Sequence, residues 1–421
     1  MSNHDNLTEQ LGRELHDRGA SVPGHPIGLG DVKKTAGRIR RRRQVAGGVV
    51  VAAAAAIIVP SVMVAGNLLG GDDAAPQPAK PSPSVTQTPE PAPSDGPIVL
   101  DADAPQGADP QTTYLDGVLL IDSAGNKTEL DKEYWSIARA GDEFLATRYG
   151  DPYFSVDVLD AEGKVLDTSQ TVTGAVSSAD GTVGAWVTPE GKVMTRFEGR
   201  TVELGTVTGG SVQAVDIVGS GSCMEVDGGC RVFLNHADGS SAPQSADSHG
   251  IVDVVGGGLK NLRAVSTDGL LGGLVTQPDP DPAAPACSAV YDEQAGKRLF
   301  RTCDYVFMYG GNAFSPDGSQ VLAQPQDGDG AGPRSIVVLD SRSGDVAAEI
   351  QVPDANSPRV TGSITHTVWE DGSHLLVKVE NNSNDGSSYN MFRVDLGDGT
   401  VERVLDERTA GGEVQPWVFI D

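Results

Sequence analysis

The sequence predicts an all-β domain of repeated units, preceded by one membrane-spanning helix and a short helical tail. From residue 98 onward, short runs rich in Val, Ile and Leu alternate with turns rich in Gly, Asp and Asn. No stretch there longer than about ten residues has helical periodicity, so strands are expected throughout. Before that domain, residues 45–69 form an uncharged apolar run. The 421 residues therefore divide into a membrane part and a β part.

Residues 44–69 are predicted to form the transmembrane helix. At a rise of about 1.5 Å per residue the apolar run reaches roughly 37 Å, more than the hydrocarbon core of about 30 Å. Five arginines lie within residues 38–43 before the run, and two aspartates follow it. This bias predicts that residues 1–43 are a basic cytoplasmic tail and that the β domain lies outside the cytoplasm. A signal peptide cleaved near Ala65 is the alternative interpretation.

Residues 70–97 are predicted to be a disordered, proline-rich stalk between the helix and the β domain. Eight prolines lie between residues 72 and 97, among Ala, Ser and Thr. Such a composition cannot bury a hydrophobic core, and it favours an extended polyproline-like chain.

Charge is divided unevenly along the chain. Residues 1–43 carry a net charge of +4, so the remainder carries −31 of the total of −27. Nucleic acids and anionic membrane surfaces are bound through clustered Lys and Arg, so the outer part is not expected to bind them. Cationic partners remain possible.

Turns within the β domain recur at a regular spacing. Each contains a glycine between two expected strands, and the seven glycines are Gly125, Gly163, Gly199, Gly239, Gly296, Gly344 and Gly399. The intervals between them are 38, 36, 40, 57, 48 and 55 residues, with a mean of about 46. A repeat of about 40 to 50 residues with four short strands is typical of a propeller blade. Residues 98–421 are therefore predicted to form a seven-bladed β-propeller.

A second marker is a strand, an Asp-Gly turn and another strand. Its full form consists of Phe314, Ser315, Pro316, Asp317 and Gly318. Weaker copies end at Gly181, Gly269 and Gly372. An Asp-Gly pair suits a turn that needs a positive φ angle, so this motif is interpreted as structural.

The F-S-P-D-G hairpin resembles the repeats of WD40-like and TolB-like β-propeller proteins. The arginine-rich segment, the Ala- and Val-rich anchor and the proline-rich stalk together resemble membrane-anchored propeller proteins of actinobacteria. The resemblance covers roughly residues 110–421 and implies a propeller there. Within that part the chain lacks the Trp-Asp and Gly-His pairs of WD40 repeats.

Ring closure is predicted to depend on the C-terminal strand. Trp417, Val418 and Phe419 are apolar, and no hairpin partner follows them. The first unit, residues 112–130, lacks a preceding strand. Because an open ring leaves unpaired strand edges, we expect the C-terminal strand to complete this first blade.

All four cysteines lie on the predicted outer side, where disulfides persist. Local spacing pairs Cys223 with Cys230 and Cys287 with Cys303, each pair closing one hairpin. Neither pair has the C-x2-4-C spacing of zinc sites, so a metal is not expected there.

Catalytic signatures are missing from the sequence. It has no G-x-S-x-G, H-E-x-x-H or G-x-x-x-x-G-K-[ST] motif. The outer histidines, which fall in four separate contexts, are His236, His249, His366 and His374. Acidic loops at 279–281 and 327–330 are interpreted as solvated turns rather than calcium sites. No catalytic, cofactor or metal residue is therefore predicted.

The four tryptophans could stack on a sugar or a peptide at the propeller mouth. They are Trp135, Trp186, Trp369 and Trp417. Each lies in or beside an alternating strand, so packing between blades is the favoured interpretation.

Together these features predict a non-enzymatic, membrane-anchored, extracytoplasmic binding or scaffold protein that presents propeller loops to a protein, peptide or glycan. One alternative is a transmembrane regulator that couples an outer ligand to the basic tail. Another is a hydrolase or lyase that uses carboxylates in the central funnel. Buried carboxylates with a histidine in the funnel would favour the enzyme, and a neutral or aromatic rim would favour binding.

Overall fold

The computed structural model describes residues 96–420 except 209–210, 227–228, 237–240, 255–257, 276–285, 327–331, 354–361, 384–385 and 410–415. The predicted tail 1–43, helix 44–69 and nearly all of the stalk 70–97 lie outside the described residues. A search of the described part alone finds no helix long and apolar enough to cross a membrane.

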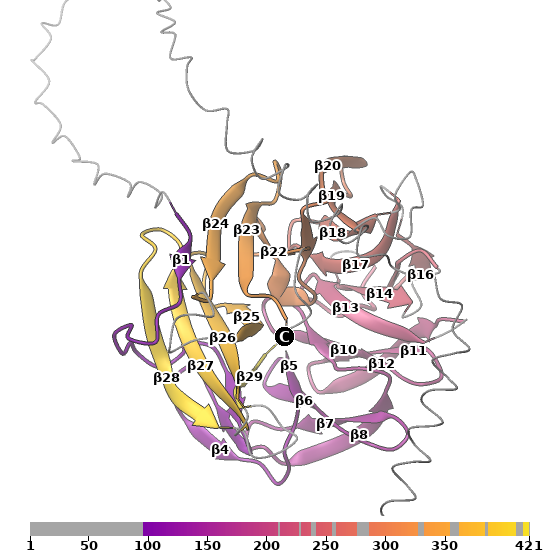
Figure 1. The fold of residues 1–421 in the computed structure, drawn as a ribbon. Coiled ribbons are helices and arrows are strands. Elements are labelled where there is room, and N and C mark those ends of the chain that lie inside the picture. The colour runs from indigo at the N-terminus through magenta and orange to yellow at the C-terminus, as the bar shows by residue number, and fades with distance from the viewer. Residues whose placement is uncertain are drawn as a thin grey trace, which may run out of the picture. The chain divides into compact units, whose positions relative to one another are not determined.

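The described strands form seven sheets arranged as blades around a centre (Figure 1). Blade 1 contains β29 (Val418–Phe419), β2 (Tyr114–Asp116), β3 (Leu119–Ile121) and β4 (Lys127–Glu129). Blade 2 contains β5 (Ser136–Ala140), β6 (Glu143–Arg148), β7 (Phe154–Leu159) and β8 (Val165–Thr171). Blade 3 contains β9 (Val176–Ser177), β10 (Val183–Val187), β11 (Lys192–Phe197) and β12 (Arg200–Thr206). Blade 4 contains β13 (Val212–Val218), β14 (Arg231–His236), β15 (Gln244–Asp247) and β16 (Gly250–Asp253).

Three more blades complete the ring. Blade 5 contains β17 (Leu259–Val265), β18 (Leu270–Val275), β19 (Cys287–Asp292) and β20 (Lys297–Thr302). Blade 6 contains β21 (Tyr305–Phe307), β22 (Gln320–Pro325), β23 (Ser335–Asp340) and β24 (Val346–Gln351), with β1 (Ile98–Val99) as a fifth strand. Blade 7 contains β25 (Ser363–Trp369), β26 (His374–Ser383), β27 (Gly386–Asp395) and β28 (Val401–Thr409). The predicted all-β, seven-bladed propeller is confirmed.

The blades have two distinct ends because their four strands run antiparallel. Turns from the first to the second strand and from the third to the fourth lie at one end, which we call the AB face. Turns from the second to the third strand and the connections between blades lie at the other end, the BC face. Loops far apart in sequence are thereby gathered on one of two surfaces.

Six of the seven predicted turn glycines lie between the third and fourth strands of a blade. Gly239 is the exception, because residues 237–240 separate the second and third strands of blade 4 and lie outside the described residues. In that blade β15 is followed by β16 after Ser248 and His249. A glycine turn marks a hairpin but does not reveal which hairpin of a blade it closes.

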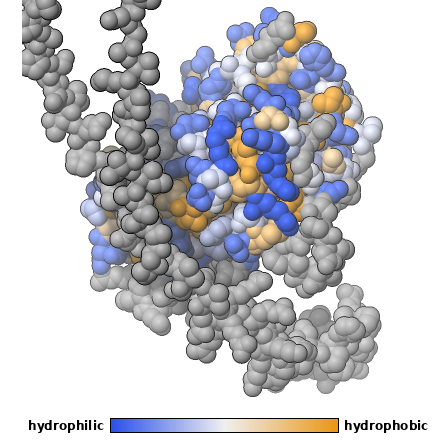
Figure 2. All heavy atoms as spheres, turned by 90° about the horizontal axis from the view of Figure 1, so that it is seen from above, coloured by the Kyte–Doolittle hydropathy of each residue, from blue (hydrophilic) through white to orange (hydrophobic). Residues whose placement is uncertain are grey.

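Apolar side chains between neighbouring blades form the core. In β10 all five residues are buried, because both faces of this strand are covered. One cluster joins blades 3 and 4 around Val193 and Val232, and another joins blades 6 and 7 around Ile336 and Phe392. On the side seen in Figure 2, hydrophilic residues cover much of the surface and hydrophobic residues show between them.

The C-terminal strand completes blade 1, as the sequence predicts. Strand β29 pairs antiparallel with β2, with Tyr114 opposite Phe419. Trp417 and Phe419 are each 1% exposed in a cluster that includes side chains from blade 7. Lys378 of β26, 3% exposed, donates from Nζ to the carbonyl oxygens of Pro416 and Trp417 at 3.4 and 3.3 Å. The segment therefore joins the last blade to the first.

A segment that the sequence did not predict lies along the outside of blades 6 and 7. This strap, residues 98–111, begins with β1, which pairs in parallel with β24 (Figure 1). Arg403 of β28 donates from Nε to the carbonyl oxygen of Ala104 at 3.1 Å. Arg393 of β27 donates to the carbonyl oxygens of Ala108 and Asp109 at 3.2 and 3.1 Å. The first residues of the domain thus bind blades 6 and 7, and its last strand binds blade 1.

Replacing Trp417 by Ala is expected to lower the free energy of unfolding by about 3 to 5 kcal/mol, because the substitution leaves a cavity between blades 7 and 1. Chemical denaturation of the two proteins measures the difference. Val346→Ala, at a position 51% exposed on β24, is the control and should change stability by less than about 0.5 kcal/mol. Equal stability of the Trp417→Ala and wild-type proteins would show that closure does not depend on this side chain.

Candidate functional site

A cavity of about 370 Å³ lies at the centre of the AB face, and we call it the cup. All seven blades contribute to its wall. One residue from each, in order from blade 1 to blade 7, is Ile420, Arg139, Ser177, Asp216, Ser266, Ser315 and Trp369. Because the residues come from the inner strands and from the turns that follow them, the ring itself assembles this site.

A short excursion of the inner strand of blade 6 forms the base of the cup. It contains the 3-10 turn η1 (Gly311–Ala313), which contacts the inner strands β13, β17 and β25. The N–H of Gly310 donates to the carbonyl oxygen of Arg263 at 3.0 Å, and Asn312 Nδ2 donates to the carbonyl oxygen of Ile420 at 3.1 Å. Gly310 has a φ of 107°, which favours glycine at this position. Gly311 and Asn312 then face the cup from below its rim.

Three turns of the cup wall share one geometry. In blades 3, 5 and 6 a serine Oγ donates to the Oδ1 of an aspartate two residues later, at 2.7, 2.5 and 2.6 Å. The pairs are Ser178 with Asp180, Ser266 with Asp268, and Ser315 with Asp317. Each serine Oγ also accepts a backbone N–H of the second strand, at 2.8 to 3.0 Å. The fold therefore uses the predicted Asp-Gly motif to order the wall of the site.

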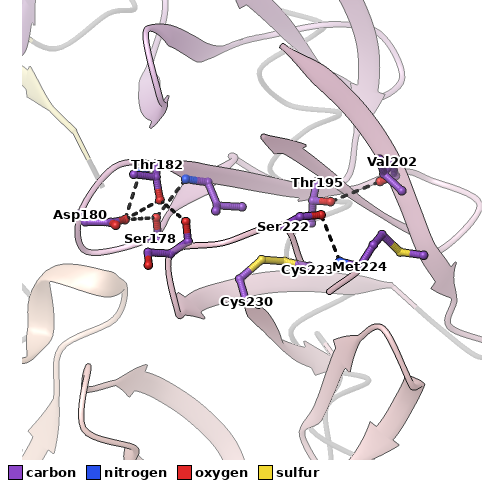
Figure 3. The surroundings of a disulfide bond; sticks show 11 residues. Ser178, Asp180, Thr182, Thr195, Val202, Ser222, Cys223, Met224 and Cys230 are labelled. Carbon is purple, nitrogen blue, oxygen red and sulfur yellow. Dashed lines mark hydrogen bonds between the residues drawn. A yellow bond between two sulfur atoms is a disulfide. The ribbon is translucent and has the colours of Figure 1, made fainter. Parts of the chain in front are cut away.

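Two of the turn aspartates, Asp180 and Asp317, are held as carboxylates. Burial raises the pKa of Asp180, but hydrogen bonds from Ser178 and Thr182 outweigh it and hold that pKa below its ordinary value (Figure 3). For Asp317 the hydrogen bond from Ser315 is the largest cause of a lowered pKa. Both groups thus remain charged while their Oδ1 atoms are used in the turn.

Neighbouring turns also bind one another, so the rim is continuous over several blades. The N–H of Gly141 in blade 2 donates to the carbonyl oxygen of Gly181 in blade 3 at 2.8 Å. Thr182 Oγ1 donates to the carbonyl oxygen of Ser220 in blade 4 at 2.9 Å.

Blade 4 replaces the serine-aspartate turn with a disulfide-closed loop. The structure pairs Cys223 with Cys230 between β13 and β14, beside the turn of Ser178 and Asp180 (Figure 3). The second pair, Cys287 with Cys303, joins the start of β19 to the residue that follows β20. The first pair closes a loop on the AB face, and the second joins the open end of a hairpin.

The buried carboxylates of the cup have structural partners. Asp216 is 4% exposed and accepts the N–H of Val265 at 3.0 Å. Glu370, whose side chain is 5% exposed, forms a two-pronged ion pair with Arg393 and accepts the N–H of Gln111 at 2.6 Å. No histidine lines the cup among the described residues. Within the same residues, no cluster of three or more His, Cys, Asp or Glu could hold a metal ion.

Some of the residues that the sequence analysis singled out line the cup, and others lie elsewhere. Phe314 and Ser315 line the cup and are 3% and 2% exposed. The four outer histidines stay apart from the cup; His374, for example, lies between Asp371 and Asp395 in blade 7. Among the tryptophans, Trp186, Trp369 and Trp417 are buried, and Trp135 is half-buried on the BC face.

Sequence reasoning missed the base of the cup and its contact with the strap. Gln111, the last residue of the strap, lines the cup together with Thr112 and Thr113, which follow it. The adjacent glycines Gly310 and Gly311, which interrupt an expected strand just before the F-S-P-D-G motif, were the available signal for the base. No local pattern marks the strap, because its partners lie more than 250 positions away.

Substituting Gly318 by Ala tests whether the rim is as tightly built as these contacts indicate. Its φ is +71°, and an added Cβ would lie 2.8 Å from Asp268 Oδ1, so we expect a loss of about 1 to 2 kcal/mol in unfolding free energy. Gly269, in the corresponding turn of blade 5, has a similar φ of +86°, but an added Cβ there would lie no closer than 3.9 Å to another atom, so Gly269→Ala is the matched control and should be less destabilising. Equal effects of the two substitutions in thermal denaturation would contradict the rim geometry.

No protein-family model matches the chain, and no curated protein matches it. Among solved structures, it is similar to the β-propeller domain of Myceliophteria thermophila Cps50 (Swd1), at 12% identity and a TM-score of 0.45, covering 74% of this chain and 92% of that one. It is also similar to the computationally designed Ika8 protein, at 11% identity and a TM-score of 0.42, covering 74% and 90%. A third similar structure is BamB from Moraxella catarrhalis, at 12% identity and a TM-score of 0.39, covering 75% and 96%. These likenesses concern the fold and carry no argument about a ligand.

Proposed function

We propose that this chain is a non-enzymatic, membrane-anchored binding or scaffold protein. In this proposal the helix 44–69 anchors it, and the propeller presents the cup outside the cytoplasm to a protein, peptide or glycan. The observation that carries the proposal is the cup itself, a concave site to which every blade contributes. Its ordered turns offer a prearranged surface to a ligand, which lowers the entropic cost of binding.

The chemistry of the cup wall supports binding over hydrolysis. A hydrolase needs a carboxylate or histidine free to exchange a proton with its substrate. Asp216 and Glu370 instead bind backbone N–H groups, and Glu370 also binds Arg393. Asp180 likewise accepts hydrogen bonds from Ser178 and Thr182. Apart from Arg139, the other polar side chains of the lining are hydroxyls and amides, including Thr112, Ser123 and Asn312.

The sequence supports the proposed location. Charge asymmetry across the apolar run, +4 before it in residues 1–43 against −31 for the rest, favours an N-terminus in the cytoplasm. The two disulfides suit an oxidising compartment.

The strap favours transmembrane regulation as a second candidate function. It begins directly after the predicted stalk and ends at Gln111 in the cup wall, next to Thr112 and Thr113. Glu370, which directly follows the inner strand of blade 7, accepts the N–H of Gln111 in the strap. A ligand in the cup would thus contact the segment that continues toward the membrane.

Filling the cup tests the binding proposal. Thr267 is exposed and lines the cup, so Thr267→Trp should occupy part of its volume without removing a turn contact of Ser266 or Asp268. Wild type and variant are compared on a glycan array and on a peptide array. Hits that depend on the cup should weaken at least about tenfold in the variant and persist in Leu166→Trp, at a position 49% exposed on β8. Array ligands that bind Thr267→Trp as tightly as wild type would show that the binding site lies outside the cup.

Membrane fractionation tests the anchor. The mature full-length chain is expected to pellet with membranes, to resist extraction by carbonate and to keep its N-terminus, because a helix of this length inserts stably. A cysteine-reactive, membrane-impermeant label should reach a cysteine placed at Ser94 but not one placed at Ser2. A dominant secreted form that begins after residue 65 would contradict the anchor.

A further inference from the structure

Four aromatic side chains gather on the BC face of blade 2, at the opposite end of this blade from the cup. We call Trp135, Tyr149, Tyr153 and Phe154 the aromatic shelf. The ring of Trp135 lies 6.1 Å from that of Tyr149 and 5.3 Å from that of Phe154, and the Tyr149 and Phe154 rings are 5.8 Å apart. Tyr149 is 59% exposed and Tyr153, in the same turn, is 44% exposed. Large side chains grouped and exposed in this way mark interaction sites more often than single exposed residues do.

The shelf is held rigidly by its backbone. The N–H of Trp135 donates to the carbonyl oxygen of Thr147 at 2.9 Å, which fixes the residue beside β6. Gly150 allows a tight turn, because a Cβ there would lie 2.2 Å from the carbonyl oxygen of Tyr153. Phe154 is the first residue of β7. A partner would therefore meet a surface that is already ordered, at a reduced entropic cost.

Charges beside the shelf are unbalanced toward negative. Lys132 Nζ and Arg148 Nε both bind Asp157 Oδ2, at 3.0 and 3.1 Å, and the side chain of Asp157 is 0% exposed. The two nearby cations are thus directed toward a buried carboxylate. Three exposed acids that form no ion pair within the described ranges remain; they are Asp131, Glu133 and Asp151.

We propose that the aromatic shelf binds a basic, arginine-containing peptide segment of a partner protein. An arginine guanidinium is planar and stacks on aromatic faces, while its N–H groups pair with carboxylates. Tyr149 and Tyr153 supply the exposed rings, and the three acids supply the charge complement. A protein with a strongly basic segment is a suitable partner for an outer domain whose net charge is far below zero.

The ring geometry favours arginine over a quaternary ammonium group. Recognition of quaternary ammonium uses aromatic rings that enclose the cation. Here the three rings of Trp135, Tyr149 and Phe154 pack on one another with interplanar angles of 30° to 57°. They present an outer surface on which a flat group stacks.

This surface is independent of the proposed cup. Strand β5 runs from Ser136, next to the shelf, to Ala140, next to cup residue Arg139. The two sites therefore lie at opposite ends of one strand. If no ligand binds at the cup, the proposal for the aromatic shelf still stands. If no peptide binds at the shelf, the proposal for the cup still stands.

Fluorescence anisotropy with labelled synthetic peptides tests the proposal on the full-length chain. The probes are two twelve-residue peptides of alternating Arg-Ser and alternating Lys-Ser sequence. We expect the arginine peptide to bind more tightly than the lysine peptide of equal charge. Tyr149→Leu and Tyr153→Leu should each weaken arginine-peptide binding about three- to tenfold, whereas Tyr149→Phe should retain it because the ring is kept. Thermal denaturation confirms that each variant is folded.

A charge-matched control separates the shelf from general attraction to an acidic domain. The triple variant Asp131→Asn, Glu133→Gln, Asp151→Asn should weaken binding more than the distant triple variant Glu162→Gln, Glu198→Gln, Asp406→Asn, whose residues are also exposed. Equal loss in both triple variants, equal binding of the two peptides, or unchanged binding in Tyr149→Leu would overturn the proposal. Binding of a neutral oligosaccharide that Tyr149→Leu abolishes, without peptide binding, would assign the shelf to carbohydrate and overturn it as well.

Discussion

The pairing of β29 with β2 is the contact on which the rest of this domain depends. Only two residue pairs join these strands, Tyr114 with Phe419 and Leu115 with Val418. They supply blade 1 with its inner strand and remove two unpaired edges. A buried ammonium would be costly alone, but Lys378 donates to two carbonyl oxygens of the same segment. Ile420, which follows β29, lines the cup and accepts a hydrogen bond from its base, so closure also builds the site.

Antiparallel order within each blade separates two surfaces with different chemistry. The AB face has the cup, whose wall combines hydroxyls, amides, Arg139 and carboxylates with structural partners with apolar side chains such as Trp369. The BC face of blade 2 has exposed aromatic rings, and beside them are three exposed acids that form no ion pair with the residues that the structure describes. Strand β5 reaches both, with Trp135 just before its start and Arg139 near its end. The two surfaces that we propose as binding sites therefore lie at opposite ends of one strand.

The acidic composition of the domain has a partly structural origin. Asp180, Asp268 and Asp317 each accept a serine hydroxyl in a tight turn, so their charges belong to the geometry of the rim. This use of carboxylates explains why an acidic protein of this kind has no free acid pair in the described wall of its cup. The same reasoning applies to Asp157 of β7, which accepts hydrogen bonds from Lys132, Tyr134 and Arg148.

Much of the fold was determined by local sequence. Glycine turns recur at blade spacing, and the motif from Phe314 to Gly318 specifies a hairpin, because a turn depends on a few neighbouring residues. The apolar end of the chain without a hairpin partner was enough to predict closure. Only the tertiary structure brings together the strap with Arg393 and Arg403, and Gly310 at the base of the cup with Arg263 of blade 5. Those contacts join residues that are tens to hundreds of positions apart, so they form only when the ring is complete. For this reason no periodic pattern in the sequence predicts them.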